Sequence, residues 1–165
     1  MEYTFKKCDE DRMAGTAQIC GIYEFGDGPD DFMSNYALAY GQLKTRFGEP
    51  MYTSKDLECL YNYCLIASDE DGNELVLTAY CGPTGPAIGG NPGDEKAVMA
   101  AKQLAEYICE AGPTDCKISG YYYDSELPLK ITLGVKNGKP YMKGGLSILR
   151  LFGMIGTYIK FFIRH

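Results

Sequence analysis

The fold of this chain is decided by one stretch, in which two strand-like runs flank an acidic turn: Leu60-Tyr-Asn-Tyr-Cys-Leu-Ile-Ala-Ser68, Asp69-Glu-Asp-Gly-Asn73 and Glu74-Leu-Val-Leu-Thr-Ala-Tyr-Cys81. In the first run, large or apolar residues recur at every second position, as they do on one face of a strand. The glycine at position 72 can take the positive φ that a tight turn needs. The stretch therefore predicts an antiparallel hairpin.

Upstream of the hairpin, the sequence predicts an edge or loose segment over the first dozen residues, then a strand and a helix. The strand is expected from Ala14 to Phe25, and alternation assigns one face to Ala17, Ile19, Gly21, Tyr23 and Phe25. Ser34 can cap a helix that continues to about Phe47, because the segment Gly48-Glu-Pro50 that follows cannot extend it.

Downstream of the hairpin, the Gly- and Pro-rich stretch 82–93 is expected to be an ordered connector to a second helix. Asn91 is the expected N-cap, Pro92 the expected first helical residue, and Gly112-Pro113 the end. The expected apolar stripe comprises Ala97, Val98, Ala101, Leu104, Ala105 and Ile108.

Strands are expected at 115–124, 129–135 and 139–143, with Asn137-Gly138 as a tight turn between the last two. Hairpins placed between helices predict an α+β fold, with a mainly antiparallel sheet and two principal helices on one face. Residues 1–143 are expected to form a single α+β domain. Residues 144–165 form an apolar, basic C-terminal segment.

Charge divides the chain sharply near its C-terminal end. Residues 1–126 contain 22 acidic and 9 basic residues, a formal charge of −13, whereas residues 127–165 contain 7 basic residues and no acidic one. An acidic surface suits a basic protein partner and disfavours nucleic acid, because binding nucleic acid requires the neutralisation of phosphates. The sequence therefore predicts that a basic protein partner is attracted electrostatically.

The residues of most enzyme and metal sites are missing from the sequence. Its single histidine is the terminal His165, there is no G-x-S-x-G motif, and none of the seven cysteines forms a C-x-x-C pair. We therefore expect no catalytic residue, no metal and no cofactor. An odd number of cysteines, together with an N-terminus that lacks an apolar signal run, favours a cytoplasmic protein.

Two alternatives remain open at this point. The first is a small-molecule-binding or hydrolytic domain that uses the Gly/Pro loop 82–93 and nearby acids, since a glycine-rich loop before a helix can hold an anion. The second is a peripheral membrane protein anchored by residues 146–165, where an apolar helix would carry a basic stripe. We expect this segment instead to pack on the domain or on a partner chain, which makes a homo-oligomer possible through it.

Candidate partner-binding residues lie in two places. The acidic hairpin turn contains Asp69, Glu70 and Asp71, which can attract a basic partner. The second place is the end of the strand at 115–124. Its residues combine aromatic anchors with acids: Tyr121, Tyr122, Tyr123, Asp124 and Glu126.

Several segments of residues 34–141 resemble small immunity proteins that bacteria encode beside polymorphic toxins. These segments are Phe47-Gly-Glu-Pro50, Tyr61-Asn-Tyr-Cys-Leu-Ile66, Asp69-Glu-Asp-Gly72 and Tyr80-Cys-Gly-Pro-Thr-Gly-Pro-Ala-Ile-Gly-Gly90. The resemblance implies a compact, acidic α+β domain that blocks a cognate toxin without catalysing a reaction. The segment 146–165 lies outside it.

Overall fold

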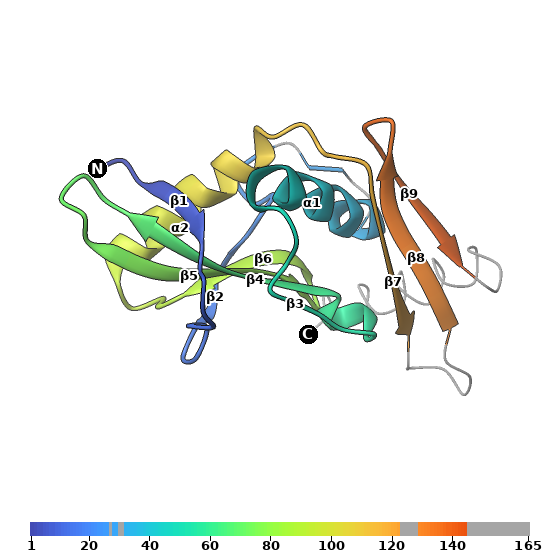
Figure 1. Ribbon diagram of the computed structural model, residues 1–165, viewed down its shortest axis with the longest axis horizontal. Coiled ribbons are helices and arrows are strands. Elements are labelled where there is room, and N and C mark those ends of the chain that lie inside the picture. Colours follow the sequence, from blue (N-terminus) through green and yellow to red (C-terminus); the bar gives the residue numbers. More distant parts are fainter. Residues whose placement is uncertain (27, 30–31, 123–128, 145–165) are drawn as a thin grey trace, which may run out of the picture.

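The computed structural model describes residues 1–26, 28–29, 32–122 and 129–144. These residues form an α+β fold with two helices, a six-stranded sheet and a three-stranded sheet (Figure 1). All strand pairs within the two sheets are antiparallel. The predicted fold class is thus confirmed, but the strands divide between two sheets.

The large sheet has the strand order β1-β4-β5-β6-β2, and a short β3 pairs with β4 beside β1. Its strands are β1 Thr4–Lys7, β2 Ala17–Gly21, β3 Tyr52–Thr53, β4 Tyr61–Ser68, β5 Glu74–Gly82 and β6 Gly85–Gly90. The predicted hairpin is confirmed as β4 and β5, with Ser68 opposite Glu74 and Gly72 at a φ of 81°. The expected edge segment at the N-terminus contains the edge strand β1.

The expected connector at 82–93 is wrong over half its length, because β6 is a buried strand between β5 and β2. Glycine is required here by close packing. A Cβ at Gly89 would lie 2.5 Å from Thr78 Oγ1, and one at Gly90 would lie 2.9 Å from Ile19 Cδ1. The sequence pattern of these glycines is typical of a loop. In the structure, their missing side chains allow β5, β2 and the side chains of those strands to pack closely against β6.

The small sheet is a meander of β7 Cys116–Tyr122, β8 Leu129–Lys136 and β9 Lys139–Gly144. These strands match the three that the sequence predicts, although they do not extend the large sheet. Asn137 and Gly138 have φ values of 53° and 73° and form the predicted tight turn between β8 and β9. Lys136 and Lys139 close this hairpin.

The two helices are α1 Phe32–Phe47 and α2 Glu95–Cys109. The N-cap of α2 is Asp94, whose carboxylate accepts the backbone N–H of Lys96, so the expectation of Asn91 is wrong. Asn91 instead accepts the N–H of Gly93 and forms the turn before the helix. Val98 is 42% exposed rather than part of the buried stripe, which includes Ala100 in its place.

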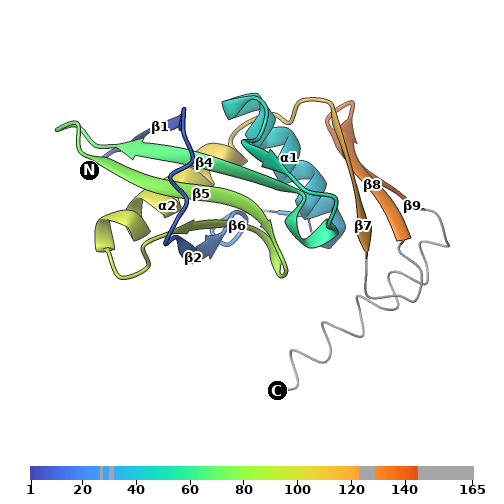
Figure 2. The ribbon, with the colours of Figure 1, turned by 60° about the horizontal axis from the view of Figure 1, so that its bottom comes forward.

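Helix α1 connects the two sheets, as Figures 1 and 2 show. It contacts β6 and α2 on one side, and β7, β8 and β9 on the other, whereas α2 covers β2, β5 and β6. One continuous apolar core joins these layers and includes Tyr36 and Leu43 of α1, Leu65 of β4, Leu104 of α2 and Leu133 of β8. Residues of both sheets thus belong to one core.

The buried face of β2 differs from the predicted one. A bulge between Gln18 and Cys20 shifts the alternation, so Cys20 and Ile22 are buried while Ala17 is exposed. The strand ends at Gly21, well before the expected Phe25, and the Phe25 side chain is 47% exposed. An aromatic residue assigned to a strand face is therefore on the surface.

Residues 145–165 lie outside the described part of the chain, so the expectations for the segment 146–165 stay predictions. No helix within the described ranges is long and apolar enough to cross a membrane.

Candidate interaction surface

The acidic hairpin turn is organised by Asp69. One of its carboxylate oxygens accepts the backbone N–H groups of Asp71 at 3.0 Å and Asn73 at 2.8 Å, and the Asn73 amide donates to the other at 2.9 Å. The hydrogen bond from the Asn73 side chain is the main cause that lowers the pKa of Asp69 below its usual value. The Asp69 carboxylate therefore holds the turn, while the side chains of Glu70 and Asp71 are exposed to solvent.

The aromatic candidate is attached to the η1 turn, Leu57–Cys59, which precedes β4. Tyr121 donates its backbone N–H to the carbonyl of Lys55 at 2.6 Å and forms a parallel bridge with Asp56. Its side chain is partly exposed. Tyr122 pairs with Leu129 through the backbone; the candidates Tyr123, Asp124 and Glu126 lie outside the described residues.

The two predicted patches do not meet. In both ribbon views, the β4–β5 turn and the C-terminal end of β7 lie far apart, on opposite sides of α1 (Figures 1 and 2). Tyr121 is the second-last residue of β7. A partner that contacts both would have to extend along the large sheet. The geometry therefore separates the acidic and the aromatic candidates into two independent surfaces.

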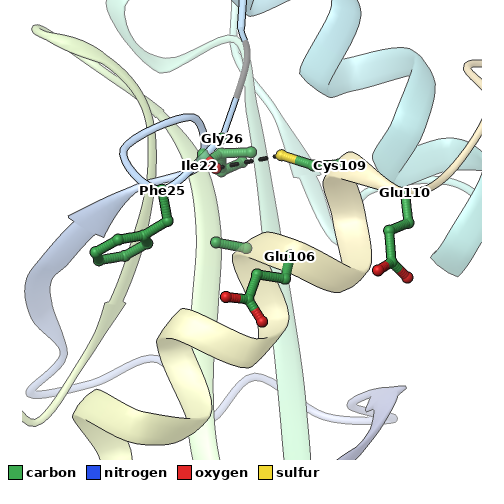
Figure 3. A pocket seen from close by; sticks show the side chains of 7 residues that line it. Ile22, Phe25, Gly26, Glu106, Cys109 and Glu110 are labelled. Atoms are coloured by element: carbon green, nitrogen blue, oxygen red, sulfur yellow. Dashed lines mark hydrogen bonds between the residues drawn. The ribbon is translucent and has the colours of Figure 1, made fainter.

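A pocket of about 270 Å³ opens between the end of β2 and the C-terminal half of α2. Ile22, Gly26 and Ala105 contribute its small or apolar lining, and Phe25 borders it. Glu106 of α2 and Glu110 at its C-cap also border the pocket. They are four residues apart, so their carboxylates lie on the same side of the helix (Figure 3). The pocket thus combines an apolar lining with two exposed carboxylates.

Cys109 lies in this pocket and donates a hydrogen bond from its thiol to the carbonyl of Ile22 at 3.4 Å, drawn as a dashed line in Figure 3. Burial raises the pKa of Cys109, and the negative charges of Glu106 and Glu110 raise it further. A nucleophilic cysteine needs the opposite environment, one that stabilises the thiolate. The surroundings of Cys109 therefore disfavour thiol catalysis.

Exposed apolar side chains extend this pocket into a larger surface on α2. Phe25 and Lys102 are in contact, with the lysine nitrogen 5.2 Å from the ring centroid. Val98 lies one helical turn from Lys102. The Val98 side chain is 42% exposed and the neighbouring Met99 side chain is 46% exposed. We call this the α2 surface, and it consists of the pocket together with Phe25, Val98, Met99, Lys102, Glu106 and Glu110. Such a cluster of exposed apolar groups is typical of an interaction site.

Half of the stretch 82–93, considered for an anion-binding loop, belongs to the large sheet. Strand β6 pairs with β5 on one side and with β2 on the other, which engages its backbone donors. Across the described ranges, no group of three or more histidine, cysteine or acidic side chains is arranged to hold a metal ion.

No protein-family model matches this sequence, and no curated protein or solved structure is significantly similar to it.

The α2 surface was not predicted from the sequence, because alternation assigned Phe25 to a strand face. Two signals do point to it. Gly26 and Pro29 follow Phe25 and break the strand, and Glu106 and Glu110 share a helix face at a spacing of four.

Proposed function

We propose that this chain is a non-enzymatic binding protein that captures a basic protein partner, in the manner of an immunity protein that neutralises a bacterial toxin by occluding its active surface. The observation that supports this most directly is the α2 surface, which combines exposed apolar side chains with a pocket bordered by two carboxylates. The formal charge of −13 in residues 1–126 adds long-range attraction for a cationic partner.

The chemistry of the pocket favours a lysine or arginine side chain of the partner. Its methylene groups would contact Ile22, Ala105 and the Phe25 ring, and its charged end would reach Glu106 or Glu110. Long basic side chains usually bury their methylene groups against apolar surface and keep the charged end at the edge, where it can pair with an acid. Phe25 would then be the aromatic anchor of the interface. The exposed hairpin acids Glu70 and Asp71 would contribute to attraction from a distance.

The proposal includes a cytoplasmic location, where an immunity protein meets a toxin before export. The odd number of cysteines and the lack of a C-x-x-C pair in the sequence suit a reducing compartment, where any disulfide would be transient.

Co-expression with the product of the gene directly upstream tests the function. If that product is the toxin, its expression alone should stop bacterial growth, and the wild-type chain should restore growth. The purified pair should associate more slowly as salt rises towards about 0.15 M, where charges are screened beyond roughly 8 Å. Unchanged growth arrest and no complex between the purified proteins would contradict the proposal.

A further inference from the structure

We propose that Cys8 and Cys64 form a reversible disulfide that fastens the N-terminal strand to the large sheet. This inference is independent of any partner. The two sulfur atoms lie 2.8 Å apart. Among the described residues, no other two cysteines have their sulfur atoms in contact. A disulfide bond is about 2.05 Å long, so closure requires only a small movement of each sulfur.

The backbone already has the geometry that the bond needs. Lys7 pairs with Leu65 in the β1–β4 register, and Cys8 continues this register by donating its N–H to the Cys64 carbonyl at 2.9 Å. Residues directly opposite in such a hydrogen-bonded antiparallel pair have Cα atoms about 5.5 Å apart. Disulfides span Cα separations of roughly 4.4–6.8 Å, so the separation expected for this register lies within the range that the bond allows.

The surroundings of the pair predict that it is oxidised slowly. Cys8 and Cys64 are 3% and 0% exposed and pack with Ile66, Met13 and Met51 on the face of the sheet away from α2. Burial and the hydrogen bond between the two cysteines raise the pKa of Cys8 to about 12. The thiolate that reacts is therefore rare at neutral pH, and closure is slow.

Access comes through the edge of the sheet. Strand β1 has four residues and pairs with β4 alone, so it can separate without disturbing the rest of the sheet. Short edge strands open at lower cost than central ones. When β1 opens, Cys8 leaves the sheet, whereas Cys64 stays in β4, which remains paired with β5.

The oxidant in this proposal is a small soluble disulfide such as oxidised glutathione. The Cys8 thiolate attacks one of its sulfur atoms, forms a mixed disulfide and releases one glutathione thiolate. The Cys64 thiolate then attacks the Cys8 sulfur and releases the second. The two cysteine protons pass to the leaving thiolates, so the cysteines are oxidised while one disulfide is reduced to two thiols.

The test is to incubate the full chain with oxidised glutathione, alkylate the remaining thiols after denaturation, and map the peptides. Cleavage after Lys7, Arg12, Lys55 and Lys96 gives the fragments 8–12 and 56–96. We expect these two fragments to be joined and lighter by two hydrogen atoms. The second fragment also contains Cys59 and Cys81, so the link should be lost in Cys64→Ala and kept in Cys59→Ala and Cys81→Ala.

Thermal unfolding gives a second measurement on the same samples. The bond closes a loop over residues 8–64, so oxidation should raise the melting temperature by an amount on the order of 10 °C, and reduction should reverse the change. Cys20→Ala is the matched control, because Cys20 is a buried cysteine of the same sheet, and it should retain the full shift. Cys8→Ala should show none. Complete alkylation of Cys8 in oxidised wild-type protein, or a link that survives Cys64→Ala, would overturn the proposal.

Discussion

The phenol of Tyr23 donates a hydrogen bond of 2.7 Å to the side-chain carbonyl of Gln42. Gln42 is 5% exposed, and its amide nitrogen in turn donates to the carbonyls of Cys109 at 3.0 Å and Ala111 at 3.2 Å. The Gln42 side chain of α1 thus forms hydrogen bonds with the Tyr23 hydroxyl, which follows β2, and with two backbone carbonyls at the C-terminal end of α2. This connection holds the wall of the pocket in place.

Replacing this glutamine should therefore be costly. Gln42→Ala leaves the Tyr23 hydroxyl and two carbonyl groups without their partner, and buried polar groups that lose a partner cost about 1–3 kcal/mol each when water cannot reach them. We expect a loss of about 3 kcal/mol in the free energy of unfolding, measured by urea denaturation. Gln18→Ala is the matched control, because Gln18 is exposed, and it should change stability by less than about 0.5 kcal/mol. Equal effects of the two substitutions would contradict this role for Gln42.

Gly41→Ala should destabilise the protein although it improves helix propensity. Alanine is favoured over glycine within a helix by about 1 kcal/mol. At this position, however, the new Cβ would lie 2.9 Å from Val135 Cγ2, 3.0 Å from Pro113 Cβ and 3.1 Å from the Thr114 carbonyl oxygen. Overpacking of this kind costs about 1–3 kcal/mol, so the clash outweighs the gain.

The control for this substitution is Gly112→Ala, since a Cβ there meets nothing within 4 Å and the backbone does not have positive φ. It should be neutral or stabilising by up to about 1 kcal/mol. A Gly41→Ala protein that unfolds at higher urea than wild type would show that α1 can shift away from β8.

Asp69 should make the stability of the hairpin depend on pH in the acidic range. Its pKa is lowered in the folded state, chiefly by the hydrogen bond from the Asn73 side chain. The ionised Asp69 carboxylate therefore stabilises the folded state fully above its pKa in the unfolded chain, about 3.9. This stabilisation is lost as pH falls through the lower pKa of the folded state. The difference in urea midpoint between wild type and Asp69→Asn should be largest at neutral pH and should shrink in strong acid.

Asp71→Asn tests whether this effect is specific to one carboxylate of the turn. Asp71 is exposed, and only its backbone N–H takes part in the Asp69 network. Its substitution should leave the urea midpoint close to that of wild type across the same pH range. A difference for Asp69→Asn that stays constant from neutral pH into strong acid would argue against the proposed role of the charge.

If the α2 surface binds a basic partner, reversing its charge should slow association. The double substitution Glu106→Lys with Glu110→Lys should lower the association rate several-fold and reduce its dependence on salt, as measured by stopped-flow fluorescence. Glu70→Lys with Asp71→Lys makes the same change in net charge at the exposed hairpin turn and is the matched control. A larger effect of the hairpin substitutions would move the binding site to the turn.

Phe25→Ala should separate binding from folding. The side chain is 47% exposed, so its removal should change stability by less than about 0.5 kcal/mol. An aromatic anchor at an interface is worth about 2 kcal/mol or more, which corresponds to a loss of affinity of roughly thirtyfold or more, mainly through faster dissociation. Unchanged dissociation of Phe25→Ala would exclude this ring as the anchor.

The elements that the sequence predicted correctly depend on local chemistry. The β4–β5 hairpin follows from alternation and from Gly72 in its turn, and Asn137 with Gly138 produces the β8–β9 turn through positive φ at both positions. Each signal lies within a few residues of the structure that it specifies. Such patterns can be read from a single sequence.

The errors arose where distant packing decides the outcome. Gly89 and Gly90 lie in a strand where Thr78 and Ile19 leave no room for a side chain, and only the folded sheet reveals this close packing. The β2 bulge moved Cys20 and Ile22 inward and left Phe25 outside, so the α2 surface could not be predicted from alternation. Tyr121 and the hairpin acids were recognised as candidates, but their separation depends on the tertiary arrangement.

The pairing of strands also imposes an order on synthesis at the ribosome. β1 and β2 are made first, yet their partners β4 and β6 end at Ser68 and Gly90, so both N-terminal strands must wait while many further residues are added. The β7–β9 meander closes between neighbours as soon as it emerges. It then docks on α1, which has already left the exit tunnel. Until then, the nascent chain exposes strand edges, and those edges are where a chaperone would be needed.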